Sequence, residues 1–273
     1  MLIGNKEFDT KHHTYIMGIL NVTPDSFSDG GNYVDLDKAL YRVEEMISQG
    51  VDIIDIGGES TRPGYVMISE GEEIDRVCST IESIKKRFDI PLSLDTYKSK
   101  VAKVGIDVGV DMINDIWGLQ YDENMAKVVA DGNVACCLMH NRKESGYQVF
   151  MQDVFSDLAS SIVKAKEVGI GNDKIILDPG VGFGKNYEQN MEVIQKINDF
   201  QKLGYPLLLG VSRKSVIGLT LNLPVEERLP GTLALSAYGI LQGCSFLRVH
   251  DVKENKEVVI MLEALKDISL KTK

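Results

Sequence analysis

Acidic and amide side chains that could bind a planar heterocycle stand directly after short apolar runs of this chain. Asp95 follows PLSL, Asn114 follows DMI and Asp178 follows KIIL. Carboxylates accept hydrogen bonds and a carboxamide both accepts and donates, which suits a ring with N–H donors and carbonyl acceptors. A single such Asp is weak evidence, because Asp often caps the helix after a strand. The carboxylates could instead bind metal, but their spread over separate runs, with no His pair at helical spacing, disfavours a dedicated transition-metal site.

Basic residues follow two later runs. Arg213, Lys214 and Ser215 come after LLLGV, and Arg248 and His250 lie in FLRVHD. Phosphate groups in (β/α)8 barrels are often bound after the seventh and eighth strands, where these residues would fall. Lys214 could alternatively form a Schiff base with a carbonyl substrate, and a lone His is more often structural. We expect this group to bind an anion.

Two long polar segments and one Met complete the set. Asn21 and Asp29 lie in NVTPDSFSDGG, which is longer than a turn requires and is typical of a functional loop. Thr61 and Arg62 lie in GGESTRPG, where glycines permit close approach of a ligand and an Arg suits phosphate or carboxylate. A salt bridge at the rim is the alternative for that Arg. Met139 would offer a polarisable surface to a ring, although a Met at a strand end more often belongs to the core.

Eight short apolar runs must position these groups. They end at Leu20, Ile56, Leu94, Ile113, Met139, Leu177, Val211 and Val249. Most intervals have the length of a strand plus a helix, and several runs are apolar almost throughout, as in parallel strands covered on both faces. An open doubly wound sheet would use similar strands, but eight units without a hairpin signal favour an α/β fold closed as a single (β/α)8 TIM barrel. Its active site would lie at the C-terminal ends of the strands.

Helical patterns occupy most of the intervals. The clearest cover residues 35–49, 69–87, 153–168, 188–202, 231–242 and 253–265. In the first, apolar residues recur at spacings of three and four from Leu36 to Ile47, and Gly50 is expected to end the helix. The interval from Leu94 to Ile113 leaves room for only a short helix. Because no linker divides the chain, residues 1–273 are expected to form one barrel domain with a short lead-in over 1–14.

Charge and composition exclude several classes. The formal net charge of −10 disfavours a nucleic-acid partner, because such binding needs clustered Lys and Arg, but local cations such as Lys185 could still hold a small anion. No run approaches the roughly 18 apolar residues of a membrane helix, and no targeting segment is evident. The four cysteines show no CxxC spacing, and the adjacent Cys136 and Cys137 should face opposite sides of a strand within the core. We therefore expect a soluble, unprocessed, cytoplasmic protein without membrane contact.

The segments after the eight runs also carry a resemblance. They are NVTPDSFSDGG, DIGGESTRPG, SLDTYKS, INDI, LMHNR, LDPGVGFGKN, GVSRKS and RVHDV. Together they resemble the bacterial dihydropteroate synthase family, from about Tyr15 to Asp251. The resemblance implies a (β/α)8 barrel that joins 6-hydroxymethyl-7,8-dihydropterin pyrophosphate to p-aminobenzoate and releases pyrophosphate in folate biosynthesis. It also implies Mg2+ dependence, a homodimer and competition by sulfonamides for the p-aminobenzoate site.

Individual roles follow from the same resemblance. The residues implied to bind the pterin are Asp95, Asn114, Met139, Asp178 and Lys214. Those implied to bind the pyrophosphate are Thr61, Arg248 and His250, with Asn21 on the Mg2+-pyrophosphate, and Arg62 is expected to bind the pterin pyrophosphate as well. Those implied to border the p-aminobenzoate are Phe27, Pro63, Phe183 and Ser215. Where the family commonly has Phe, this chain has Val216. This difference is expected to change the packing behind the Lys214 loop and to leave the pterin contacts unchanged.

The chemistry of these residues agrees with the implied roles. Asp178 can accept from the 2-amino and N3–H edge of a pterin while Lys214 donates to its acceptors. Arg248 and Mg2+ would neutralise charge growing on the pyrophosphate, and the electron-rich ring would stabilise the exocyclic carbon as a cation. The arylamine is a neutral nucleophile, so no strong base is required, and Asp29 is expected to stabilise the cation. The expected catalytic residues are therefore Asp29, Lys214 and Arg248.

Two other classes remain open. A related pterin-binding methyltransferase would use a similar barrel without pyrophosphate and should lack the combined NVTPDSFSDGG, SRK and RVHD set. A catalytically silent pterin-binding module could keep the pterin residues and lose Asn21, Arg248 or His250. All of these features are present, so the sequence favours an active synthase.

Overall fold

Eight parallel strands form the centre of the protein. The computed structural model describes residues 1–22, 32–59 and 67–271. The strands of the large sheet are β3 (Tyr15–Asn21), β4 (Ile53–Gly57), β5 (Leu92–Asp95), β6 (Met112–Asp115), β7 (Ala135–Met139), β8 (Ile175–Asp178), β9 (Leu208–Leu209) and β10 (Phe246–Val249). Each falls on one of the apolar runs of the sequence.

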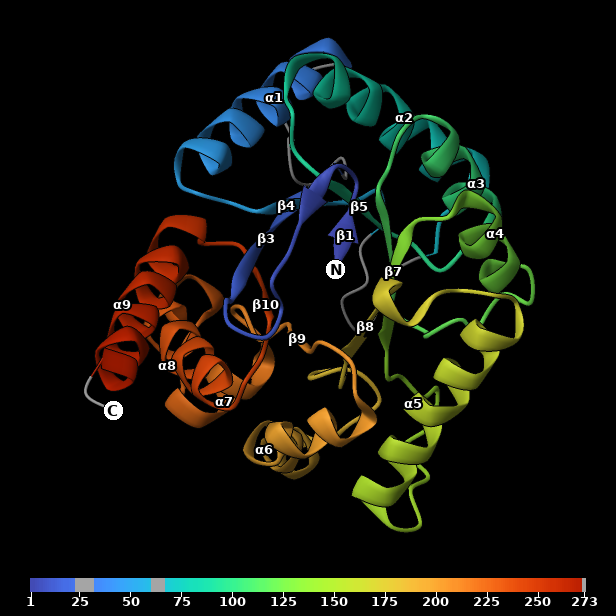
Figure 1. The fold of residues 1–273 in the computed structure, drawn as a ribbon. Coiled ribbons are helices and arrows are strands. Elements are labelled where there is room, and N and C mark those ends of the chain that lie inside the picture. Colours follow the sequence, from blue (N-terminus) through green and yellow to red (C-terminus); the bar gives the residue numbers. More distant parts are fainter. Residues whose placement is uncertain (23–31, 60–66, 272–273) are drawn as a thin grey trace.

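The sheet closes on itself. Its strand order is β8-β7-β6-β5-β4-β3-β10-β9, and a parallel bridge between Leu177 and Leu207 joins the two outer strands. At this seam the Leu177 N–H donates to the Pro206 carbonyl at 2.9 Å. Figure 1 shows the strands at the centre and the helices around them. The expected (β/α)8 barrel is therefore confirmed.

Helices follow the strands and cover the outside of the barrel (Figure 1). They are α1 (Asn32–Ser48), α2 (Glu70–Arg87), α3 (Ser99–Asp107), α4 (Met125–Gly132), α5 (Phe150–Glu167), α6 (Tyr187–Gln195), α7 (Ser215–Leu221), α8 (Leu229–Leu241) and α9 (Val252–Lys271). Ser69 caps α2 by accepting from the Glu72 N–H, and Gly50 adopts a φ of +87° just after α1, as its proposed role in ending that helix requires. The expected helix over 188–202 instead divides into α6 and a 3-10 segment (Ile197–Leu203).

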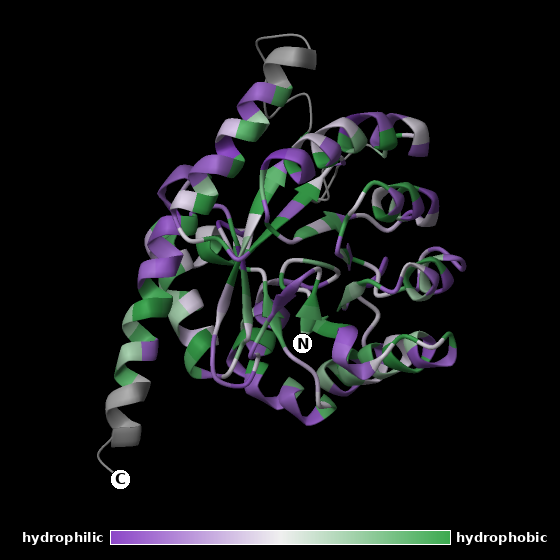
Figure 2. Ribbon diagram, turned by 45° about the horizontal axis from the view of Figure 1, so that its top comes forward, coloured by the Kyte–Doolittle hydropathy of each residue, from purple (hydrophilic) through white to green (hydrophobic). Residues whose placement is uncertain are grey.

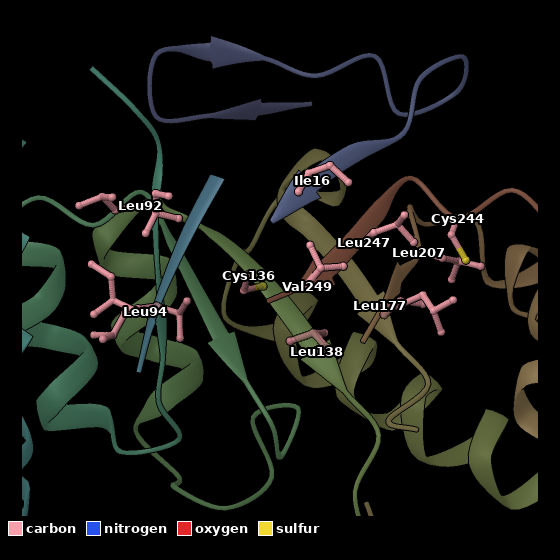
Figure 3. Packing of buried hydrophobic residues seen from close by; sticks show 14 of the residues in the cluster. Ile16, Leu92, Leu94, Cys136, Leu138, Leu177, Leu207, Cys244, Leu247 and Val249 are labelled. Carbon is pink, nitrogen blue, oxygen red and sulfur yellow. The ribbon is translucent and has the colours of Figure 1, made fainter. Parts of the chain in front are cut away.

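Successive side chains along each strand point to opposite faces of the barrel wall, so the apolar residues form an outer and an inner layer. Outward residues such as Cys136 and Leu138 pack under the helices, as Figure 3 shows, whereas Cys137 joins a layer inside the barrel with Met17 and Phe246. The two adjacent cysteines therefore face opposite sides of β7, as expected, and all four cysteines are free. Hydrophobic residues concentrate on the strands and hydrophilic ones on the surrounding helices (Figure 2). None of the described helices is long and apolar enough to cross a membrane.

A hairpin closes the N-terminal end of the barrel. Strands β1 (Leu2–Ile3) and β2 (Lys6–Glu7) pair antiparallel within the segment expected to be only a lead-in. Ile3 and Phe8 are fully buried against the inner layer, where the Phe8 ring contacts Tyr15 and Phe246. Each buried apolar side chain contributes about 1.5–3 kcal/mol. The hairpin therefore covers the N-terminal end of the barrel, opposite the C-terminal strand ends where the site residues are expected.

Candidate active site

The C-terminal ends of the strands bring polar residues together inside the barrel. Asp95 of β5 lies opposite Asn114 of β6, and Met139 of β7 lies opposite Asp178 of β8. All four side chains are buried. Each stands two positions after an inward-facing residue of its own strand, which is Ser93, Met112, Cys137 and Ile176 in turn, so the pleat alone directs them into the barrel. The structure thus gathers residues that lie up to 83 positions apart in the sequence.

Arg248 of β10 joins this group through two ion pairs. Its Nε donates to Asp55 Oδ2 and its Nη2 donates to Asp95 Oδ2, each at 2.6 Å. Asn114 Nδ2 also donates to Asp55 Oδ2, at 3.1 Å. Burial raises the pKa of Asp95 to about 7, against the opposing attraction of Arg248. Burial alone would lower the pKa of Arg248, but the two carboxylates raise it above its usual value.

Three buried polar atoms of this group lack a hydrogen-bond partner in the described part of the chain. They are Asp55 Oδ1, Ser93 Oγ and Asp95 Oδ1. Asp55 and Ser93 are opposite one another on β4 and β5. Buried polar atoms in native proteins are nearly always hydrogen-bonded. These atoms therefore mark a place where a polar ligand or water completes the site.

Asp178 and Lys214 are two further groups of opposite charge, which lie close together and attract one another. Asp178 Oδ1 accepts from the Gly180 N–H at 2.7 Å, and Lys214 Nζ donates to the Val181 carbonyl. A Cβ on Gly210 would lie 3.6 Å from Asp178 Oδ2 and 3.7 Å from Lys214 Nζ, so both groups border the same small space. Burial raises the pKa of Asp178 and lowers that of Lys214 to about 8, and each charge opposes the shift of the other.

Apolar side chains border the charged groups. Met139 packs with Tyr97 and Ile116, and Trp117 and Phe183 cover this cluster. Lys214 Nζ lies 4.8 Å from the centroid of the Phe183 ring. A buried carboxylate and ammonium group next to such a cluster can hold a flat, polar ring by its edge and its face.

Comparison with known proteins shows the family to which the chain belongs. The family described as pterin binding enzyme matches residues 17–250. The chain is 56% identical to the dihydropteroate synthase of Clostridium beijerinckii, over 97% of this chain and 99% of that protein. It belongs to the dihydropteroate synthase family of pterin-binding enzymes. The family comprises transferases of folate biosynthesis, and the chain is accordingly an enzyme of this class.

Further relatives support this membership. The dihydropteroate synthase of Bacillus subtilis is 52% identical over 93% of this chain and 90% of its own length. A crystal structure of the Clostridium difficile dihydropteroate synthase, obtained in the presence of pteroic acid, superposes with a TM-score of 0.93 at 48% identity and covers 95% of this chain and 99% of that one. A Yersinia pestis structure with a sulfonamide drug complex gives a TM-score of 0.91 at 39% identity and covers 98% and 99%.

Three other expected positions that the structure describes lie at the C-terminal ends of the strands or just after them, which we call the mouth of the barrel. Asn21 ends β3 opposite Gly57, and a Cβ on that glycine would lie 3.4 Å from Asn21 Oδ1. His250 follows β10, and its Nδ1 is 2.9 Å from Ser212 Oγ. Ser215 begins α7 and is exposed, and Val216 beside it is buried in the outer apolar layer. The expected site residues Phe27, Asp29, Thr61, Arg62 and Pro63 lie outside the described residues.

The described ends of the second long loop are fixed by a buried ion cluster. Lys98 Nζ donates to Glu59 Oε2 and Glu73 Oε2, each at 2.7 Å. Ile68 joins both partners, because its N–H donates to Glu59 Oε2 at 2.8 Å and its carbonyl accepts from Lys98 Nζ at 2.9 Å. Residues 59 and 68 are therefore held against α2 and the β5 loop.

Several charged residues near the strand ends are bound to other groups of the protein. Arg213 forms a two-point ion pair with Asp251, at 2.9 and 2.7 Å. Asp115, which neighbours Asn114, accepts from the N–H groups of Trp117 and Leu119, and burial raises its pKa to about 6. The cation Lys185, which the sequence offered as an anion ligand, is turned toward acceptors of its own loop.

The sequence reasoning missed Asp55 and Ser93. Both occupy inward positions of apolar runs, and Asp55 connects Arg248 to Asn114. The sequence did contain a sign of the role of Asp55, because a lone Asp inside the apolar run IIDI is costly to bury unless it has a hydrogen-bonding or charged partner. The partner, however, lies 193 positions away on β10, and only the closed barrel reveals it.

Proposed function

We propose that the chain joins 6-hydroxymethyl-7,8-dihydropterin pyrophosphate to p-aminobenzoate, giving 7,8-dihydropteroate and pyrophosphate. The observation that carries the proposal is that buried Asp178 and Lys214 border one small space, next to Arg248 and its partners Asp55 and Asp95. A pterin has both donors and acceptors on its edge, and this pair offers it an acceptor and a donor. The similarity to dihydropteroate synthases over nearly the whole chain supports the same reaction.

The proposed binding mode assigns one function to each part of the site. Asp178 accepts from the 2-amino and N3–H groups of the pterin, and Lys214 donates to its acceptors. Asn114 and the unpartnered Asp95 Oδ1 complete the edge contacts, while Met139 lies against the ring. The ring thereby replaces solvent around groups whose hydrogen bonds are incomplete in the described chain.

The proposed reaction is a dissociative displacement. The bond between the exocyclic methylene carbon and the pyrophosphate oxygen breaks, and its electron pair leaves with the oxygen. The arylamine nitrogen then forms a bond to that carbon and releases a proton to solvent. Arg248 and His250 neutralise the pyrophosphate, since Arg248 directs only two of its five N–H donors to Asp55 and Asp95. Asp29 is proposed to stabilise the cation, and equal turnover in Asp29→Asn would remove it from the mechanism.

A divalent cation is part of this proposal. Among the described residues no cluster of three or more His, Cys, Asp or Glu side chains could hold a metal. Asn21 supplies one amide oxygen at the mouth, which fits Mg2+ held mainly by substrate phosphates and water. Mg2+ bound there would supply positive charge to the pyrophosphate.

The p-aminobenzoate is proposed to bind beside the pterin. Phe183 and Ser215 are proposed to border this region from the β8 and β9 loops, and Phe27 and Pro63 are proposed to complete it. Thr61 and Arg62 are proposed to lie near the pyrophosphate. Because the Yersinia pestis relative was solved with a sulfonamide, we propose that sulfonamides compete for the same pocket here. The free cysteines are consistent with a reducing cytoplasm as the proposed location.

Pyrophosphate release tests the reaction class. Release should require both the pterin pyrophosphate and p-aminobenzoate, and it should stop when Mg2+ is chelated. An equal rate without p-aminobenzoate would indicate hydrolysis and contradict a synthase.

Lys214→Met should weaken pterin binding by about 1.5–3 kcal/mol, or roughly 10- to 150-fold, because a charged hydrogen bond is lost. The wild-type affinity should also fall as the pH rises above about 8, since deprotonation removes the ammonium charge of Lys214. Calorimetric titration with 6-hydroxymethylpterin at pH 7 and pH 9.5 measures both effects. Lys202→Met, on an exposed surface pair, is the control. If Lys214→Met binds the pterin as tightly as the wild type does, the assignment of Lys214 to the pterin is wrong.

We propose a homodimer formed through α7, α8 and α9. Figure 1 shows these helices side by side on one flank of the barrel. Large apolar side chains are exposed on them, at Leu219, Leu221, Leu241, Ile260 and Met261. Exposed apolar patches of this kind are typical of protein interfaces.

The dimer is tested by sedimentation velocity. Leu241→Glu should shift the protein from dimer to monomer, because the new charge would be buried at the interface. Val163→Glu on α5 is a matched control, since Val163 is similarly exposed on another flank. A monomeric wild type, or a dimer unaffected by Leu241→Glu, would argue against this interface.

A further inference from the structure

A chain of hydrogen-bonded polar groups, with the buried His140 at its centre, lies behind the β8 loop. Lys185 Nζ contacts three acceptors: His140 Nδ1 at 2.8 Å, the Gly180 carbonyl at 2.9 Å and the Phe183 carbonyl at 3.1 Å. On the far side of the imidazole, His140 Nε2 lies 3.0 Å from Asp157 Oδ2. The proposed reaction uses neither Lys185 nor His140.

The contacts set the proton positions of this chain while Lys185 is protonated. Burial lowers the pKa of Lys185 to about 7, and below that pH its ammonium group has no acceptor, so His140 Nδ1 accepts from Lys185 and His140 Nε2 carries the proton that is donated to Asp157. The His140 side chain is fully buried, and burial together with Lys185 lowers its pKa to about 3. The charged groups facing Lys185 are Asp178, Asp157, Lys214 and Arg142. The imidazole is therefore a neutral, oriented acceptor.

Lys185 also closes the turn that carries the pterin contacts. By binding the carbonyls of Gly180 and Phe183, it ties the beginning of the turn to its end. Within that turn the Gly180 N–H donates to Asp178, Val181 accepts from Lys214, and the Phe183 ring lies beside Lys214. Gly180 has a φ of +71°, and a Cβ there would overlap the His140 carbonyl oxygen, so the turn fits closely against the β7 end.

We propose that Lys185 is a positioning residue of the pterin site, which holds the Gly180–Phe183 turn and is itself oriented by His140 and Asp157. This inference rests on the proposed function of the same site. Three acceptors already surround the ammonium group, so an anion could reach it only by displacing one of them. Lys185 thus acts on the substrate through the turn and does not bind it.

Pterin titrations of substituted proteins test the proposal. Lys185→Met should weaken binding of 6-hydroxymethylpterin roughly 10- to 100-fold, since small displacements of site groups have effects of this size. The KM for p-aminobenzoate should also rise, because Phe183 borders its proposed pocket. Lys202→Met should leave both quantities unchanged.

A pair of substitutions at His140 separates positioning from general stability. Asn can place its amide oxygen near the position of Nδ1, so His140→Asn should keep the acceptor for Lys185 and bind the pterin within about threefold of wild type. His140→Leu removes the acceptor and should resemble Lys185→Met. If Lys185→Met does not fold, this pair alone decides the matter.

The possible outcomes are distinct. If the wild-type protein does not bind the pterin, the proposed function is contradicted, whereas the role of Lys185 in shaping the turn is not. A wild type that binds, with Lys185→Met at equal affinity, overturns the inference. Equal losses in His140→Asn and His140→Leu also overturn it, since only the first retains an acceptor for Lys185.

Discussion

Replacing Arg248 with Met should destabilise the folded barrel by about 3–5 kcal/mol and lower turnover at least roughly 100-fold. The guanidinium group balances Asp55 and Asp95, which are both buried, and its loss leaves two carboxylates facing one another inside the barrel. The same group is proposed to neutralise the departing pyrophosphate. Urea unfolding measures the first effect and pyrophosphate release the second.

The pH dependence of this variant follows from Asp95. Its pKa in the folded protein, about 7 with Arg248 present, lies above the ordinary value of 3.8, so protonation favours the folded state. This contribution is fully present below about pH 3.8 and is lost as the pH rises through about 7. The destabilisation of Arg248→Met should therefore be smaller at pH 5 than at pH 8.

An exposed arginine provides the comparison. Arg87 contacts Glu44 at 3.7 Å on the surface, and Arg87→Met should change stability by less than about 1 kcal/mol. In the Arg248→Met background, Asp55→Asn should restore part of the lost stability by removing one of the two charges. An Arg248→Met protein as stable as Arg87→Met would show that the buried network does not hold these charges as described.

Asp178→Asn should weaken pterin binding by about 3 kcal/mol, or more than roughly 100-fold, with little change in stability. An amide group would direct an N–H donor at the donor edge of the pterin, whereas the carboxylate accepts there. Stability should not suffer, because burial raises the pKa of Asp178 and its ionised form already costs free energy in the folded protein. Calorimetry and urea unfolding on the same preparations measure the two quantities.

Asp115→Asn is a control with the opposite expected pattern. Asp115 is also buried at a strand end, but it accepts from the N–H groups of Trp117 and Leu119. Its substitution should lower stability by about 1 kcal/mol and leave pterin affinity nearly unchanged. Similar affinity losses in both variants would mean that Asp178 has no special role at the pterin edge.

The barrel and one rim of polar groups could be predicted from the sequence because each depends on local rules. Apolar runs at strand-plus-helix spacing specify parallel strands, and the residue after each run must lie at a common edge. Asp95, Asn114, Met139 and Asp178 followed from that argument alone. The roles of Asn21 and the p-aminobenzoate residues came from the family resemblance and remain predictions.

Other parts depended on contacts between distant segments. Asp55 has a partner on β10, and Lys185 has one just after β7, so neither pairing is visible in its own segment. Lys185 was expected to bind an anion because a sequence shows the charge of a side chain but does not show which way that side chain points. The β1–β2 hairpin escaped notice because two-residue strands are too short to show a period.

Product analysis tests the central claim most directly. Incubation of the wild type with the pterin pyrophosphate, p-aminobenzoate and Mg2+ should yield 7,8-dihydropteroate by mass spectrometry, with one pyrophosphate released for each molecule formed. Consumption of the pterin pyrophosphate with hydroxymethyldihydropterin as its only pterin product would contradict the account, since water and not the arylamine would then be the nucleophile.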